Sequence, residues 1–162
     1  MKRSIGVTIA VVIGVAALTA GATMPGRTKN YVNDYAGVLT LQERAAMEVV
    51  LRRSHNIHPK TEIIVTTFKD TMGRPLEEFE HDYIVRWRMW WPFDNPRRAH
   101  LILLLDPPQV RLLLSAPLLR IIPPGRMDQI LIHRMGPYID EGRYADGLMT
   151  GLYDVLQDLG RL

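Results

Sequence analysis

Residues 101–115 read Leu-Ile-Leu-Leu-Leu-Asp-Pro-Pro-Gln-Val-Arg-Leu-Leu-Leu-Ser, and they carry the strongest fold signal in the chain. The run from Leu101 to Leu105 is wholly apolar, which predicts a central strand. The two prolines that follow predict a turn, and the run from Val110 to Ser115 predicts the next strand. The stretch therefore predicts a β-hairpin.

Upstream of this hairpin, the run from Glu62 to Phe68 is β-branched and apolar, which predicts a buried strand. Four other segments have the spacing of amphipathic helices. The predicted helices run from a capping box at Thr40 to about residue 55, from Pro75 to about residue 87, from about residue 126 to 141, and from 144 to 159. This order of elements predicts an α/β fold in which a short mixed β-sheet is covered by helices.

The composition excludes several classes of function. The 162 residues include no Cys, which excludes thiol catalysis, Cys-ligated zinc sites and iron–sulfur clusters. Of the 20 basic residues, Lys2 and Arg3 stand at the N-terminus, and the others are interspersed with the 17 acidic residues. A nucleic-acid binder usually has a basic face or stripe, so we expect no nucleic-acid partner.

An uncharged run follows the two N-terminal basic residues, and its apolar part covers 18 residues from Ile5 to Ala22. As a helix, this part would span about 27 Å, just enough for the hydrocarbon core of a membrane. We expect residues 1–26 to be a membrane anchor that contacts lipid, and residues 27–162 to be an extracytoplasmic domain. The residues expected to define the anchor are Lys2, Arg3, Ile5, Val11, Ile13 and Leu18.

The basic flank of this anchor predicts its orientation. Lys2 and Arg3 favour a cytoplasmic N-terminus, so we expect a single-pass protein of the inner (cytoplasmic) membrane with a periplasmic domain. Ala20-Gly21-Ala22 also fits a signal-peptidase site, so a cleaved signal peptide is the alternative. Both interpretations place the domain on the far side of the membrane.

Several motifs together carry a family resemblance. They are the opening Val32-Asn33-Asp34-Tyr35-Ala36-Gly37-Val38-Leu39, the helical Leu76-Glu77-Glu78-Phe79 followed by Arg86-Trp87, and the tail Gly142-Arg143-Tyr144-Ala145-Asp146-Gly147-Leu148. Over roughly residues 31–157 the chain resembles the TPM domain family, whose name joins thylakoid lumen, photosystem II-associated and acetylcholine-receptor-modulating members. The resemblance implies a TPM-like α/β domain after one transmembrane helix.

The resemblance breaks at two motifs that line a metal or phosphate cleft in the family. Arg98-Ala99-His100 stands where members usually carry Asp-Asn-Gly, and Ala116-Pro117-Leu118-Leu119-Arg120 stands where they carry Gly-x-Gly-Leu-Glu. Asp34 is the remaining candidate for a vestigial cleft, although a carboxylate at this position also suits a cap for the turn before the helix. Calcium needs six to eight oxygen ligands, so we expect no catalytic residue, no metal and no cofactor.

Aromatic residues gather between the second predicted helix and the central strand. Trp87 fits the apolar stripe of that helix, but Trp90 and Trp91 are adjacent and cannot share one narrow helix face. Exposed Trp beside Arg is the composition of an interface hot spot. The predicted partner interface consists of Trp90, Trp91, Phe93, Arg97 and Arg98; the alternative is an aromatic plug that closes one end of the core.

These observations predict a non-catalytic accessory subunit that assembles or stabilises a larger membrane protein complex. The photosystem II-associated members make a photosynthetic reaction-centre or antenna assembly one candidate host. The apolar run contains no His to ligate a chlorophyll magnesium, so assembly is expected rather than pigment binding. The alternatives are a membrane-tethered phosphatase that depends on a divalent cation, because some family members are reported as phosphatases, and a periplasmic chaperone-like module.

Overall fold

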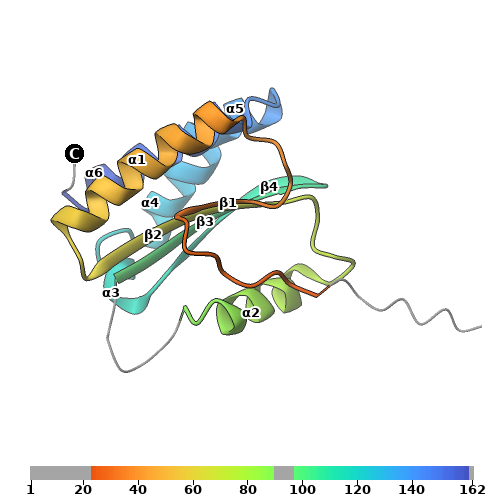
Figure 1. Ribbon diagram of the computed structural model, residues 1–162, viewed down its shortest axis with the longest axis horizontal. Helices are drawn as coiled ribbons and strands as arrows, with labels where there is room; N and C mark the ends of the chain where they lie inside the picture. The colour runs from red at the N-terminus through yellow and green to blue at the C-terminus, as the bar shows by residue number, and fades with distance from the viewer. Residues whose placement is uncertain (1–22, 90–96, 161–162) are drawn as a thin grey trace, which may run out of the picture.

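A four-stranded mixed sheet forms the centre of the domain in the computed structural model, which describes residues 23–89 and 97–160 (Figure 1). The strands lie side by side in sequence order. The first three are parallel and the last pairs antiparallel with the third. The strands are β1 (Val32–Asp34), β2 (Thr61–Phe68), β3 (Arg97–Leu105) and β4 (Pro108–Leu114). The α/β class and the hairpin of β3 and β4 confirm the sequence-based prediction.

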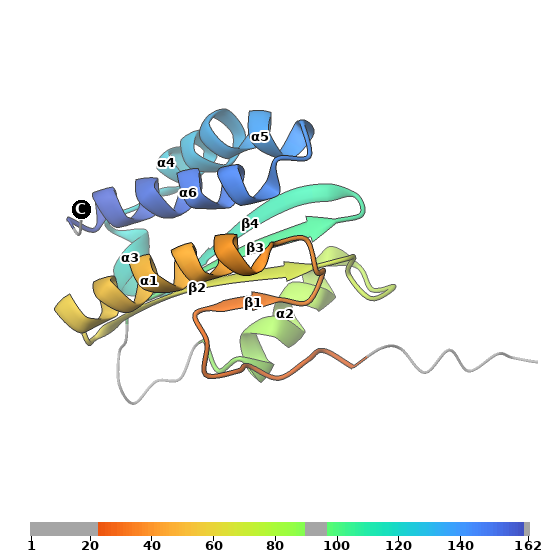
Figure 2. The ribbon, with the colours of Figure 1, turned by 45° about the horizontal axis from the view of Figure 1, so that its top comes forward.

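Helices cover both faces of this sheet (Figures 1 and 2). Alternate residues of a strand point to opposite faces. Ile63 and Leu101 therefore belong to the core under α1 and α6, whereas Ile64 and Ile102 belong to the core over α2. The two central strands bury side chains on both faces, which explains why Ile63–Val65 and Leu101–Leu105 are apolar without alternation.

The long helices follow the sequence closely. In α1 (Leu41–Ile57), Thr40 and Glu43 form the expected capping box. Pro75 precedes α2 (Leu76–Arg86), and α6 (Tyr144–Asp158) closes the described chain. These helices have clear start signals and apolar stripes, so their local sequence is sufficient to place them.

The helix expected over residues 126–141 is confirmed as one unbroken helical run over residues 124–140, but its middle part is not α-helical. The segment is divided into α4 (Pro124–Asp128), a π-helix η1 (Gln129–Met135) and α5 (Gly136–Asp140). Pro137 has no N–H to continue an α-helical ladder, and the N–H of Gly136 bonds five residues back to the carbonyl of Leu131. The wider turn brings Met135 inward, where it is fully buried.

Two glycines of α6 let this segment pack closely. A Cβ placed on Gly151 would lie 2.2 Å from the sulfur of Met135, and one on Gly147 would lie 2.9 Å from Cδ1 of Ile139. Real Cβ atoms essentially never approach other atoms so closely. A side chain added at either glycine would therefore force Met135 or Ile139 to move. The family-like tail motif thus acts here as a packing surface for η1 and α5.

Three elements differ from the sequence-based prediction: β3 in its start, and the two short elements β1 and α3 in their existence. β3 begins at Arg97 rather than Leu101, because Arg97 to His100 pair in register with residues 61–64 of β2. The three-residue strand β1 and the short helix α3 (Ala116–Leu119) were not predicted. Elements this short have no measurable period, so only their neighbours specify them.

Part of the segment over residues 23–31, between the apolar N-terminal run and the first family-like motif, packs on the domain. Met24 is only 3% exposed and joins the core over α2. The Trp87 Nε1–H donates to the Pro25 carbonyl (3.1 Å), and the Tyr35 hydroxyl donates to the Gly26 carbonyl (3.0 Å). We call residues 24–28 the docked segment. The packed domain therefore starts before the boundary at residue 27 that the sequence suggested.

The anchor predicted over residues 1–26 lies mostly outside the described residues, and Lys2, Arg3, Ile5, Val11, Ile13 and Leu18 are all outside them. Within residues 23–89 and 97–160, no helix has the length and apolar character needed to cross a membrane.

Candidate functional site

Asp34 lies at the carboxyl end of β1, the edge of a parallel sheet where ligands usually bind. One carboxylate oxygen accepts hydrogen bonds from the backbone N–H groups of Gly37 (3.0 Å) and Val38 (3.2 Å), and the other accepts from Leu39 (3.0 Å). The hydroxyl of Thr67, at the end of β2, also donates to this carboxylate. Asp34 is thus the cap of the turn that leads into α1.

This geometry leaves little coordinating capacity at Asp34. Four donors already point at its two oxygens, and the Thr67 hydroxyl is itself shared with the N–H of Ala36 (3.2 Å). A calcium ion would need to displace several of these bonds and recruit further oxygens. In the described part of the chain, no cluster of three or more His, Asp or Glu side chains is placed to hold a metal ion.

The two altered cleft motifs are built into packed elements. Arg98-Ala99-His100 lies inside β3, and Ala116-Pro117-Leu118-Leu119 forms α3, whose Leu118 is fully buried. In place of flexible backbone turns, these positions carry a strand and a helix. They supply no carboxylate at the sheet edge.

His100 is the most unusual polar residue of the domain. It is 0% exposed, and its Nδ1 lies 3.0 Å from the Tyr83 hydroxyl, which in turn lies 3.0 Å from the Thr66 hydroxyl. Within the described residues, its Nε2 has no hydrogen-bond partner. A consistent arrangement has Thr66 donating to Tyr83 and Tyr83 donating to a neutral imidazole.

Burial controls the ionisation of this network. It lowers the pKa of the His100 imidazole to about 3, and the positive charges of Arg27 and Arg98 act in the same direction. Burial also raises the pKa of the Tyr83 phenol above its ordinary value. Both groups are neutral at physiological pH, so they form a structural hydrogen-bond chain rather than an acid–base pair.

Trp87 completes this aromatic cluster. Its ring stacks on Tyr83 with centroids 4.6 Å apart, and it is only 2% exposed. The sequence-based assignment of Trp87 to the core is confirmed. The Tyr83, Trp87 and His100 rings meet beneath the docked segment.

The structure separates the two arginines of the predicted partner interface. Arg97 is exposed at the start of β3. Arg98 is directed inward: its guanidinium donates to the Arg88 carbonyl (2.5 Å) and lies 3.4 Å from Glu62. Adjacent residues of a strand point to opposite faces, so the two arginines leave β3 in different directions. The other members of the predicted interface, Trp90, Trp91 and Phe93, lie outside the described residues.

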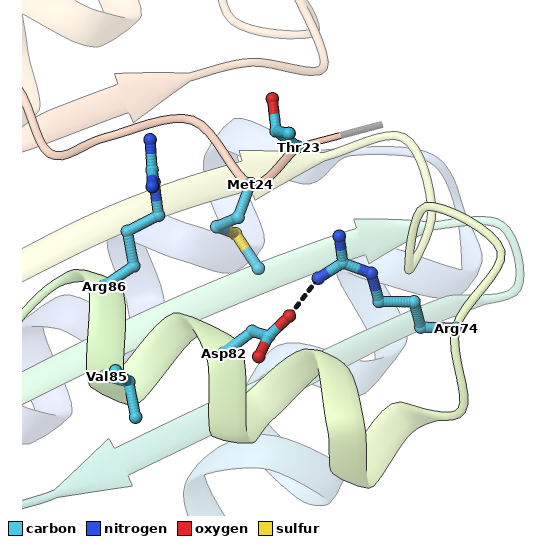
Figure 3. A pocket seen from close by; sticks show the side chains of 6 residues that line it. All are labelled: Thr23, Met24, Arg74, Asp82, Val85 and Arg86. Carbon is cyan, nitrogen blue, oxygen red and sulfur yellow. Dashed lines mark hydrogen bonds and ion pairs between the residues drawn. The ribbon is translucent and has the colours of Figure 1, made fainter. Parts of the chain in front are cut away.

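A hollow of about 350 Å³ lies between the docked segment and α2 (Figure 3). Thr23, Met24, Val85 and Arg86 line it, and an ion pair between Arg74 and Asp82 spans its floor. That ion pair neutralises most of the lining charge. The hollow offers apolar contact but no convergent set of polar groups for chemistry.

A second hollow, of about 710 Å³, lies at the opposite, amino-terminal end of β2 and β3. It gathers three basic side chains, His58, Lys60 and Arg97. Sequence reasoning missed this group because Lys60 and Arg97 are distant in the chain. Only the parallel register of β2 and β3, in which Thr61 pairs with Arg97, brings them together.

Comparison with known proteins agrees with this fold. The model of the TPM domain family matches residues 32–158, and the chain belongs to this family. A similar solved structure is the solution NMR structure of the N-terminal domain of a protein from P. gingivalis, with 31% sequence identity and a TM-score of 0.71 over 80% of this chain and 82% of that one. A search of curated proteins gave no match.

Proposed function

We propose that this TPM-domain protein is a non-catalytic accessory subunit that assembles or stabilises a larger membrane protein complex. The observation that carries the proposal is the state of Asp34. Its carboxylate accepts hydrogen bonds from three backbone N–H groups and one hydroxyl, so it holds a turn. A carboxylate used in this way is poorly placed to bind a cation or to act as a nucleophile.

The elements around Asp34 support the same proposal. Hydrolysis of a phosphate ester with a divalent cation requires several oxygen ligands on one open edge. Here the two altered cleft positions lie in β3 and in α3, and His100 of β3 is fully buried against α2. A phosphatase needs an open sheet edge with several oxygen ligands, whereas a protein that only binds a partner does not.

The docked segment supports tethering at a membrane. If residues 1–22 form the anchor, the chain leaves it one residue before the buried Met24. The Trp87–Pro25 and Tyr35–Gly26 hydrogen bonds then fix the domain close to the membrane. In this proposal the domain is periplasmic, the N-terminus is cytoplasmic, and the partner is an integral membrane complex for which a photosynthetic assembly is one candidate.

Purification from native membranes tests this proposal. The full chain, extracted with a mild detergent, should elute with other integral membrane proteins in constant proportion, and protease added to the cytoplasmic face should leave the domain intact. Elution of the chain alone, or digestion of the domain, would contradict the proposal.

Enzyme assays supply an independent test. We expect no phosphatase turnover above background with calcium, magnesium or manganese. Robust turnover that disappears in Asp34→Ala, with the variant still folded by circular dichroism, would refute the non-catalytic role.

A further inference from the structure

The hollow at the amino-terminal end of β2 and β3, which we call the basic pocket, is the second notable surface of the domain. It is lined by Ile57 and His58 from the end of α1, by Pro59, Lys60 and Thr61 from the connection into β2, by Arg97 from β3 and by Pro117 from α3. We propose that the basic pocket binds an acidic segment of another protein that carries an apolar side chain between its carboxylates.

The walls of the basic pocket are fixed by backbone hydrogen bonds. The Arg97 N–H donates to the Lys60 carbonyl (3.1 Å), and the Thr61 N–H donates to the His58 carbonyl (2.9 Å). The Ser115 N–H donates to the Arg98 carbonyl (2.9 Å), which holds the start of α3 against β3. The pocket is therefore formed before any ligand arrives, which lowers the ordering cost of binding.

The charge of the basic pocket is uncompensated within the described residues. Its lining includes no carboxylate, and neither Lys60 nor Arg97 forms an ion pair there. The next carboxylate along β2, that of Glu62, is already engaged by Arg27 and Arg98. Several arginines outside the pocket lining do form ion pairs with carboxylates; they are Arg27, Arg52, Arg74, Arg98, Arg111, Arg126, Arg134 and Arg143.

The apolar part of the lining favours a peptide over a bare anion. Ile57, which is 57% exposed, lines the pocket together with Pro59 and Pro117. A phosphate ion or a lipid headgroup would contact the basic side chains but leave this apolar surface exposed to water. An aliphatic side chain of a partner would bury it. The volume also lies in the range of pockets that hold several side-chain groups.

Binding of a fluorescent peptide to the full chain in non-ionic detergent tests the inference. The probe is Glu-Asp-Leu-Glu-Asp, and its neutral analogue is Gln-Asn-Leu-Gln-Asn. The double variant Lys60→Gln with Arg97→Gln should weaken binding of the acidic probe about tenfold or more, equivalent to about 1.4 kcal/mol. The matched control, Lys69→Gln with Arg86→Gln, removes the same charges from outside the pocket and should leave the affinity unchanged.

A charge-swap variant controls for misfolding, because a misfolded chain would not gain a new binding specificity. Lys60→Glu with Arg97→Glu should lose the acidic probe and gain binding of Lys-Arg-Leu-Lys-Arg. Ile57→Ser should weaken the acidic probe but not a version with Ser in place of its Leu.

Three outcomes would overturn the inference. The first is equal affinity of the acidic probe for the pocket variant and the control variant. The second is displacement of the probe by inorganic phosphate at equal charge concentration, which would assign the pocket to small anions. The third is a loss of binding to phosphatidylglycerol vesicles in the pocket variant that exceeds its loss of peptide binding, which would assign the pocket to lipid. The first two results do not depend on whether the chain is anchored or non-catalytic.

Discussion

Stability in acid should depend on His100 more than on any other histidine of the domain. The imidazole is fully buried, and its pKa is about 3 in the folded chain against an ordinary value of 6.5. Between these values the unfolded chain binds a proton that the folded chain does not. The contribution of neutral His100 is therefore fully present above pH 6.5 and is lost as the pH falls toward 3.

The size of this effect follows from the two pKa values. Each pH unit below 6.5 costs about 1.4 kcal/mol of unfolding free energy for one proton. Acidification from about pH 7.5 to about pH 4.5 should thus remove about 2–3 kcal/mol through His100 alone. This is a large share of the stability of an ordinary domain, which is about 5–15 kcal/mol.

The substitution His100→Leu removes the titrating group and keeps a similar volume. Carboxylates also titrate in this range, so the informative quantity is the difference between the original chain and the variant. Urea unfolding followed by circular dichroism should show that the original chain loses about 2–3 kcal/mol more of its unfolding free energy than His100→Leu over this interval. The control His81→Asn changes an exposed histidine and should keep the full acid slope. Equal slopes for His100→Leu and the original chain would refute the reasoning.

Three further predictions concern the turn, the helix packing and the aromatic loop. Asp34→Ala leaves three backbone N–H groups without their acceptor and should lower the free energy of unfolding in urea by about 2 kcal/mol or more. The control Asp106→Ala, in an exposed turn, should change it by less than about 0.5 kcal/mol, and equal effects of the two substitutions would contradict the turn role of Asp34. Gly151→Ala should lower the free energy of unfolding by about 1–3 kcal/mol despite the better helix propensity of Ala, because its Cβ would overlap a methionine sulfur; an unchanged or raised value would contradict the close packing. Trp90→Ala with Trp91→Ala should weaken association with the native complex by about 2 kcal/mol or more while the domain stays folded, as measured by co-purification and circular dichroism; unfolding of the domain would instead show an aromatic plug.

The sequence by itself determined the layers of the domain. The β-branched and apolar run at residues 62–68 and the wholly apolar run at residues 101–105 predict central strands, because a strand covered by helices on both faces has no exposed face for alternating polar residues. The capping box at Thr40 and the glycine-rich tail likewise specify local structure within a few residues. Such signals can be recognised in the sequence alone because each depends on residues that are neighbours in the chain.

Only the tertiary structure decided the roles of the polar residues. Nothing near His100 in the sequence indicates that it lies beneath Tyr83, since the contact depends on the crossover from β2 through α2 to β3. The same holds for Arg98, which turns inward to Glu62, and for Lys60 and Arg97, which the strand register brings together. The hydrogen-bond partner and the local dielectric of a polar side chain come from segments distant in sequence, so the sequence alone could not assign these sites.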